Sequence, residues 1–266
     1  MNWEPSRADH SIDRATASAT LREPLDANAL DDLIVAGRRI AEAHKMLGRL
    51  DQLEPIEVKP GVGQVVQIGL GSGPPEGVSR QVLFRRVDSE GVAVDEISLA
   101  KGRVAAGTIR YSRWVDLFKL AEDLFRGLNE SIPILQNLKT VRLEFVDRFN
   151  SIPGGADHFE VISKKSPYLP PILADRDANL HAHSGWFDAE SAAVRRLTNV
   201  NIDVRNIPNQ TEGRRTISTL TMGQFEALEG TLDRPLERIV GLHGYLKAIF
   251  GDLITKEAAE RVALNK

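Results

Sequence analysis

The stretch from Tyr111 to Phe149 constrains the fold of this chain most, because it combines two different hydrophobic periods. Its first part repeats apolar residues at the spacing of a helix with one buried face. These residues are Trp114, Leu117, Phe118, Ala121, Leu124, Phe125 and Leu128. Its second part alternates Val141, Leu143, Phe145 and Phe149 with charged residues, which is typical of a strand with one face in a core. We therefore expect a helix with its N-cap at Ser112, followed by a half-buried strand.

The rest of the chain repeats this plan around the central stretch. The sequence predicts strands over residues 15–21, 64–70, 78–87, 92–99, 104–109, 179–187, 194–204 and 215–222. It predicts further helices over 27–50, capped by Asp26, and after caps at Asp233 and Thr255. Because consecutive strands joined by short turns pair antiparallel, we expect an α+β protein. Its antiparallel sheets should carry amphipathic helices on one face, in two similar halves that each run from strands to a helix.

The same patterns divide the chain into segments. Residues 1–13 are polar and are expected to form a disordered tail. Residues 14–130 and 131–266 are the expected N-terminal and C-terminal α+β halves of one compact unit. Residues 151–177 are rich in proline and form a predicted irregular loop. The glycines of Gly69–Gly73 predict a hairpin loop, since a phosphate-binding loop would carry a lysine and a following helix.

Composition excludes several classes of protein. The 266 residues are 42% hydrophobic and contain no apolar run long enough to span a bilayer, so no membrane partner is expected. The chain has no cysteine, which excludes disulfides and thiol catalysis and fits a cytoplasmic location. Its formal charge of −3 argues against a nucleic-acid protein that binds through bulk charge.

His181 and His183 form the most obvious candidate metal site. On a strand the two imidazoles point to the same side, and Asp188, Asp175 or Asp177 would supply a carboxylate. No third ligand stands at a diagnostic spacing, so the pattern favours an exposed strand face. We expect no metal and no other cofactor.

Asp147 and His243 are expected to form a structural polar core. Both stand among apolar residues, one on the central strand and the other on the last long helix. A buried carboxylate needs a partner, so we predict that Asp147 meets His243 or an arginine. Asp157-His158 in the irregular loop is interpreted as a solvated pair, because adjacent residues rarely make a productive hydrogen bond with each other.

Paired arginines are the candidate basic patch. They are Arg85, Arg86, Arg195, Arg196, Arg214 and Arg215. If these pairs converged they would bind phosphate. The sequence lacks the interleaved aromatic residues of single-strand binders, so solvated strand faces are favoured.

Three motifs resemble a sporadically distributed family of uncharacterised bacterial and archaeal proteins. The motifs are Tyr111-x-x-Trp114, the run Val141–Phe149, and Leu242-His243 followed by Phe250 and Ile254-Thr255. The family patterns read Pro-Tyr-x-x-Trp, Leu-Arg-Tyr-x-Asn-Arg-Ile and a C-terminal Leu-His-x6-Phe-x3-Ile-Thr. The chain departs from them at Arg110, Glu144, Phe145 and Asp147, where the family has proline, arginine, tyrosine and asparagine. The resemblance covers roughly residues 80 to 264.

The resemblance implies a fold and no activity. The sporadic distribution of the family implies mobile or defence-associated gene cassettes. We therefore expect a non-catalytic protein-interaction or regulatory protein, for example of a toxin–antitoxin or antiphage system. Its expected partner is another protein, and homo-oligomerisation is left open. Two alternatives stay open: a metal-dependent hydrolase that uses His181 and His183, and a nucleic-acid or nucleotide binder that uses the paired arginines.

Overall fold

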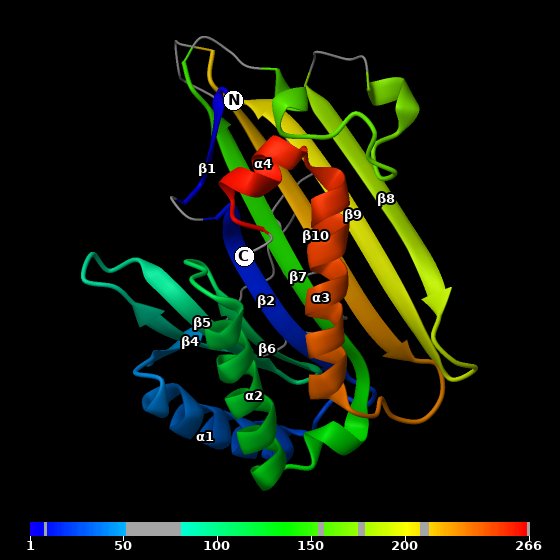
Figure 1. The fold of residues 1–266 in the computed structure, drawn as a ribbon. Coiled ribbons are helices and arrows are strands. Elements are labelled where there is room, and N and C mark those ends of the chain that lie inside the picture. Colours follow the sequence, from blue (N-terminus) through cyan, green and yellow to red (C-terminus); the bar gives the residue numbers. More distant parts are fainter. Residues whose placement is uncertain (8–9, 52–80, 154–156, 175–178, 208–212, 265–266) are drawn as a thin grey trace, which may run out of the picture.

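One antiparallel sheet runs through the protein, and the helices pack against one of its two faces (Figure 1). The computed structural model describes residues 1–7, 10–51, 81–153, 157–174, 179–207 and 213–264, with 47–51 as backbone only. Within these ranges the sheet has ten strands. None of the described helices is long and apolar enough to cross a bilayer.

Apart from two strands that the patterns do not predict, Trp3–Pro5 and Leu47–Asp51, the described elements follow the predicted order. The strands are β1 (Trp3–Pro5), β2 (Ile12–Leu21), β3 (Leu47–Asp51), β4 (Gln81–Val87), β5 (Ala93–Ala100), β6 (Arg103–Thr108), β7 (Leu138–Ser151), β8 (Leu180–Ala189), β9 (Val194–Asn206) and β10 (Arg215–Ala227). The helices are α1 (Ala27–Ala43), α2 (Trp114–Ser131), α3 (Pro235–Leu253) and α4 (Lys256–Arg261). Short 3-10 turns cover Ile134–Asn137, His158–Glu160 and Pro171–Leu173.

The strand order shows how the two halves join. It runs β3-β4-β5-β6-β2-β7-β10-β9-β8, and β1 pairs with the end of β7. In the first half β6 returns to pair with β2, and α2 follows; in the second half β10 returns to pair with β7, and α3 follows. The pairing of β2 with β7 makes the two halves one sheet. The predicted α+β class, with strands followed by a helix in each half, is confirmed.

The core lies between the sheet and the helices. β7 contributes Val141, Leu143 and Phe149, which are completely buried. The apolar face of α2 packs over β2 and β6, while α3 packs over β7 and β10. The predicted caps hold at two helices: Asp26 accepts a hydrogen bond from the backbone N–H of Ala29 at 2.8 Å, and Thr255 accepts one from Ala258 at 3.2 Å.

The N-terminal prediction is wrong. Within the range expected to be a disordered tail, Trp3–Pro5 forms β1, Ile12 begins β2, and Trp3 is completely buried. The Trp3 indole N–H donates to the backbone carbonyl of Asp157 at 2.9 Å. This bond ties the start of the chain to the segment after β7. The predicted helix over 27–50 also ends early, at Ala43, because Lys45 has a left-handed backbone and the chain then enters β3.

Two predicted caps are wrong as well. Arg113, not Ser112, is the N-cap of α2, and the Ser112 hydroxyl instead donates to Asp116 at 2.7 Å. Arg234 occupies the N-cap of α3, while Asp233 pairs with Arg238. The strand predicted over 64–70 and the hairpin loop of Gly69–Gly73 lie outside the described residues.

α3 approaches the sheet closely at Gly223 of β10. A Cβ atom at this position would lie 2.6 Å from Cδ2 of Leu242 and 3.5 Å from Cδ2 of Leu246. The absence of a side chain therefore lets α3 lie against β10, and the position of α3 sets the position of the side chains that it carries.

Gly223→Val should lower the free energy of unfolding by about 1–3 kcal/mol, because the added methyl groups would push α3 away from the sheet. Ser218→Val is the matched control, since Ser218 lies on the other face of the same strand. Its effect should stay within ~0.5 kcal/mol. Urea denaturation measures both variants, and equal stabilities would contradict close packing of α3 on β10.

Candidate functional site

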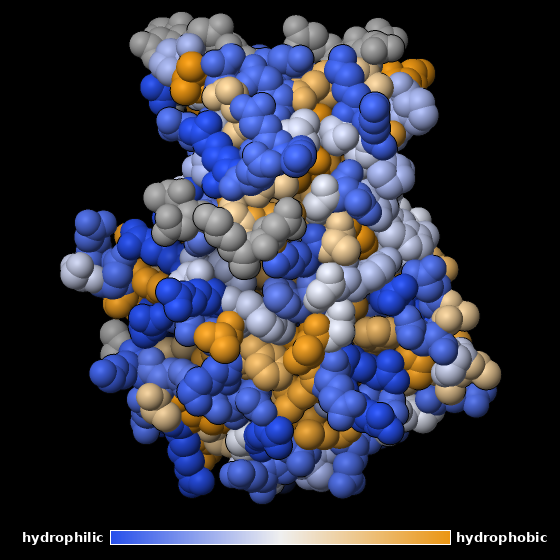
Figure 2. Space-filling view, viewed as in Figure 1, coloured by the Kyte–Doolittle hydropathy of each residue, from blue (hydrophilic) through white to orange (hydrophobic). Residues whose placement is uncertain are grey.

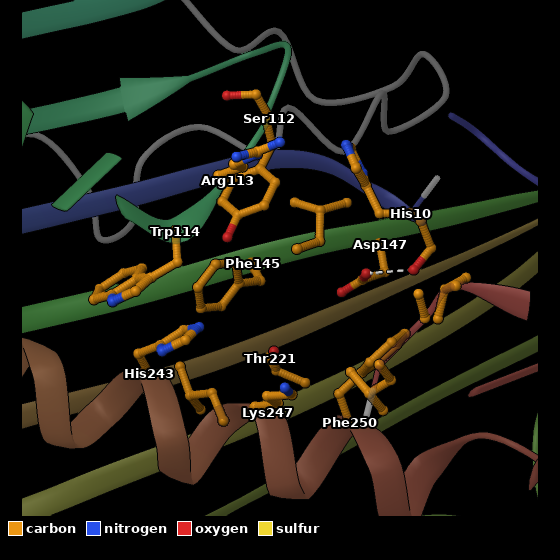
Figure 3. Close-up of a pocket in the computed structure, with 17 residues that line it drawn as sticks. His10, Ser112, Arg113, Trp114, Phe145, Asp147, Thr221, His243, Lys247 and Phe250 are labelled. Atoms are coloured by element: carbon orange, nitrogen blue, oxygen red, sulfur yellow. Dashed lines mark hydrogen bonds between the residues drawn. The ribbon is translucent and has the colours of Figure 1, made fainter. Parts of the chain in front are cut away.

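A cavity of about 990 Å³ opens between the sheet, the start of α2, and helices α3 and α4 (Figure 3). Its volume lies in the range of ~300–1,000 Å³ that is usual for ligand sites. The lining residues are His10, Ser11, Ile12, Tyr111, Ser112, Arg113, Trp114, Phe145, Asp147, Thr221, His243, Leu246, Lys247, Phe250, Val262, Ala263 and Leu264. Both halves of the chain contribute to the cavity.

Five rings line the cavity as a continuous series, which we call the aromatic row: His10, Tyr111, Phe145, His243 and Trp114. Successive ring centroids lie 5.5 Å apart for His10 and Tyr111, then 6.1 Å, 6.1 Å and 4.0 Å along the row. The rings of His243 and Trp114 are parallel within 1° and are stacked. The residues come from four distant parts of the chain, so the row exists only in the folded protein.

Asp147 lies at the floor of the cavity and is 2% exposed. Ser11 Oγ donates a hydrogen bond to Asp147 Oδ1 at 2.7 Å. A register shift in β2 between Ile12 and Arg14, opposite Asp147 and Val146, is the local irregularity that accompanies this contact. Burial raises the pKa of the Asp147 carboxyl to about 7, against the opposing effect of the Ser11 hydrogen bond.

Two members of the aromatic row titrate outside their usual ranges. Burial raises the pKa of the Tyr111 hydroxyl, and the carboxylates of Asp147 and Asp116 raise it further. Burial lowers the pKa of the His243 imidazole, and the positive charge of Lys247 lowers it further. Tyr111 is therefore protonated and His243 neutral at pH 7.

Thr221 supplies a second polar group at the floor. It lies on β10 opposite Phe145, is 1% exposed, and its hydroxyl has no hydrogen-bond partner among the described residues. Arg113 and Lys247 are exposed at the rim, and neither forms an ion pair within the described ranges. The cavity thus combines an apolar aromatic wall, a polar floor and a positively charged rim.

The structure places the predicted pair Asp147 and His243 in the same cavity but does not join them. The described hydrogen-bond partner of Asp147 is Ser11, not His243 or an arginine. His243 is only half-buried and stacks on Trp114. The carboxyl group is buried as predicted, but a hydroxyl satisfies it in place of a positive charge.

The candidate metal ligands lie elsewhere, on the exposed edge strand β8. His181 Nδ1 lies 2.8 Å from Asp203 Oδ1, and His183 Nδ1 forms a hydrogen bond with Asn201. Asp188 pairs with Arg196, while Asp175 and Asp177 lie outside the described residues. Among the described residues, no group of three or more His, Asp or Glu side chains is placed to hold a metal ion.

The arginine pairs do not converge. Adjacent residues on a strand point to opposite faces, and the described acidic residues neutralise several of these arginines. Arg85 pairs with Glu96, Arg86 with Asp95, Arg195 with Glu226, and Arg196 with Asp188 and Glu190. Arg215 is buried on β10, and Arg214 directly precedes that strand.

His158 also differs from its prediction. Its side chain is completely buried and packs against Phe159 at 4.0 Å between ring centroids, so it is not a solvated loop residue. Asp157 accepts a hydrogen bond from the backbone N–H of Phe159 at 2.9 Å and caps a 3-10 turn. The pair stabilises the segment after β7.

Sequence reasoning missed several cavity residues. Ser11 and His10 lie in the segment predicted to be disordered, and Arg113 and Lys247 belong to none of the patterns from which sites were predicted. The sequence did indicate Thr221, because it lies four residues after Ile217 on a predicted strand and therefore on the same, buried face. A threonine on a buried strand face indicates either a hydrogen-bond partner or a site.

Asp147→Asn should stabilise the protein increasingly as pH rises. The unfolded carboxyl ionises near ~3.9 and the folded one near 7, so the unfolded state loses its proton first and the wild type loses stability between these values. The variant keeps an oxygen for the Ser11 hydroxyl and does not titrate. Its advantage should be below ~1 kcal/mol at pH 4 and approach ~4 kcal/mol above pH 8. Urea denaturation at pH 4, 6 and 8 measures it, and a constant difference would rule out titration near neutrality.

Comparison with known proteins gives no assignment. The sequence matches no protein-family model and no curated protein. The geometry of the cavity is therefore the basis on which a function is proposed.

Proposed function

We propose that this protein acts by binding, without catalysing a reaction, and that the cavity receives its ligand. The observation that carries the proposal is the hydroxyl of Thr221, which has no hydrogen-bond partner in the described part of the chain and is buried at the floor of an open cavity beside aromatic rings. Buried polar groups are normally hydrogen-bonded. A ligand that enters the cavity would supply the missing partner and cover the apolar wall.

The arrangement of the polar groups favours binding over nucleophilic catalysis. A serine nucleophile usually bonds a histidine that a carboxylate orients. Here Ser11 bonds the carboxylate of Asp147 directly, at 2.7 Å, and the His243 ring stacks on Trp114. No charge relay from carboxylate to imidazole to hydroxyl joins these three residues among the described hydrogen bonds.

A regulatory role follows from the position of the cavity. Trp114 belongs to the first half of the chain and His243 to the second, and their rings stack across the junction. A ligand in the cavity would contact residues of both halves and would favour the arrangement in which both contribute contacts. The family resemblance supports the same site through the motif residues Tyr111, Trp114, His243 and Phe250, which line the cavity, whereas the lining residues Phe145 and Asp147 are positions at which this chain departs from the family pattern.

A rim-blocking variant tests this proposal. Ser112→Trp should place a large ring at the mouth of the cavity, whereas Ser89→Trp adds the same ring at an exposed turn whose residues do not line the cavity. In a thermal-shift screen of a small-molecule library, compounds that bind the cavity should raise the melting temperature of the wild type and Ser89→Trp but not of Ser112→Trp. Hits that stabilise all three proteins equally, or no hits, would contradict a binding role for the cavity.

Protein–protein interaction is a second candidate function, and the surface of the helices favours it. Figure 2 shows apolar side chains gathered over α2 and α3 on a face that is otherwise largely polar. Val115 of α2 is 64% exposed and Val240 of α3 is 47% exposed. Val115 follows Trp114, and Val240 lies one helical turn before His243, so a partner on this surface would contact the helices that line the cavity. The lack of cysteine fits a cytoplasmic location, so the proposed partner is a cytoplasmic protein.

Glu substitutions at Val115 and Val240 should abolish that contact, because they place charges in an apolar interface. Val87→Glu and Val92→Glu form the control pair, since both valines are exposed on the β4–β5 hairpin. Light scattering after size exclusion measures self-association, and quantitative affinity capture measures other partners. Retention of the same partner and oligomeric state by both pairs of variants would rule out this surface.

A further inference from the structure

The floor of the cavity selects hydrogen-bond donors. Ser11 occupies Oδ1 of Asp147, and Figure 3 shows the other carboxylate oxygen turned toward the cavity on the Phe145 side. An ionised carboxylate only accepts hydrogen bonds, and N–H groups that bind a charged acceptor give stronger bonds than neutral pairs. A ligand that offers N–H donors here would stabilise the buried negative charge.

Thr221 adds the opposite capacity on the neighbouring strand, where it lies opposite Phe145 and diagonal to Asp147. A threonine hydroxyl both donates and accepts, and this one has no partner among the described residues. The two groups together suit a ligand edge that carries N–H donors next to a carbonyl oxygen. The aromatic row favours a ligand whose edge belongs to a flat ring, because the faces of flat rings pack on aromatic side chains.

The charges at the rim of the cavity determine which group the outer end of the ligand carries. Arg113 and Lys247 bring two positive charges to the mouth of the cavity, with no ion-pair partner in the described part of the chain. They would repel a cationic ligand and attract a phosphate, which Arg and Lys both bind well. The ligand thus has a flat, donor-bearing end inside and an anionic end outside.

Among nucleobases, guanine fits this floor best. Its pairing edge carries the ring N–H and the amino group side by side, next to a carbonyl oxygen. Adenine and the pyrimidines place an acceptor beside their donor, and that acceptor would face the carboxylate of Asp147 with repulsion.

We propose that the cavity binds a guanine nucleotide, with the base packed on the aromatic row, its N–H donors on Asp147, its carbonyl on the Thr221 hydroxyl, and its phosphate between Arg113 and Lys247. This inference rests on the proposed binding function and specifies its ligand. The paired arginines of the sequence analysis take no part in the site, since the rim cations come from α3 and from the residue that precedes α2.

Isothermal titration calorimetry with GMP, guanosine, AMP and inorganic phosphate tests the assignment on the full chain. GMP should bind, guanosine about tenfold more weakly because it lacks the phosphate, and AMP and phosphate alone not measurably at the same concentrations. Lys247→Ala should reduce the affinity for GMP toward that for guanosine, because only Arg113 then remains to bind the phosphate. Lys256 is an exposed lysine of α4, and Lys256→Ala should leave both affinities unchanged. Binding of AMP as tight as that of GMP would overturn the assignment of guanine.

A specificity switch gives the sharper test. Asp147→Asn should weaken GMP binding by roughly 10- to 100-fold, the loss expected for a hydrogen bond to a charged group. The same variant should gain affinity for xanthosine monophosphate, because xanthine presents a carbonyl where guanine has its amino group and the asparagine amide donates to it. Glu144→Gln is the matched control: Glu144 is a buried acid on the other face of β7, and its loss should change neither preference.

The outcomes separate this inference from the proposed function. Loss of GMP binding with a gain for xanthosine monophosphate in Asp147→Asn supports the guanine assignment. If no nucleotide binds while the library screen yields compounds that Ser112→Trp excludes, the guanine assignment fails and the binding function stands. If neither nucleotides nor library compounds depend on the cavity, both fail. Circular dichroism of each variant confirms that it is folded.

Discussion

The pairing of β2 with β7 is the interaction on which the rest of the structure depends. Within the first half of the chain, β2 pairs with the last strand, β6. Within the second half, β7 pairs with the last strand, β10. Without the pairing of β2 with β7 the protein would be two smaller sheets, each with its own exposed edge. With it, α2 and α3 lie over neighbouring strands of one surface, and the stacking of Trp114 on His243 becomes possible.

The site arises where this pairing becomes irregular. Regular alternation along β7 turns Phe145 and Asp147 toward the helices, and the register shift in β2 brings Ser11 to the same place. A buried carboxyl that is satisfied by a hydroxyl, not by a positive charge, is costly to ionise. The protein retains this buried carboxyl group at the floor of the cavity, although its ionisation costs stability. Local features that cost stability are commonly found at functional sites.

The sequence predicted the fold better than the site, for physical reasons. Strand alternation and helical spacing report which face of an element is buried, so β7, α2 and the plan of the two halves followed from local patterns. Two of the four predicted caps, Asp26 and Thr255, are confirmed, whereas the N-caps of α2 and α3 lie one residue after the predicted ones. The strand β1 was missed because Trp3 is buried by residues more than a hundred positions away. The cavity could not be predicted for the same reason, because its residues are distant in sequence. Asp147 and His243 were found as polar residues on apolar faces, but their true neighbours Ser11 and Trp114 depend on how distant segments pack.

The long sequence separation of these contacts has a kinetic consequence. The Ser11–Asp147 hydrogen bond joins residues 136 positions apart, and the two halves meet through strands of similar separation. Folds dominated by such non-local pairing reach their native state slowly, because loop-closure entropy is lost before the contacts form. The cavity is complete only when both halves have docked. A folding transition state in which this docking is unfinished would therefore bind the ligand weakly. Ligand binding should therefore leave the refolding rate unchanged and prolong the lifetime of the native state.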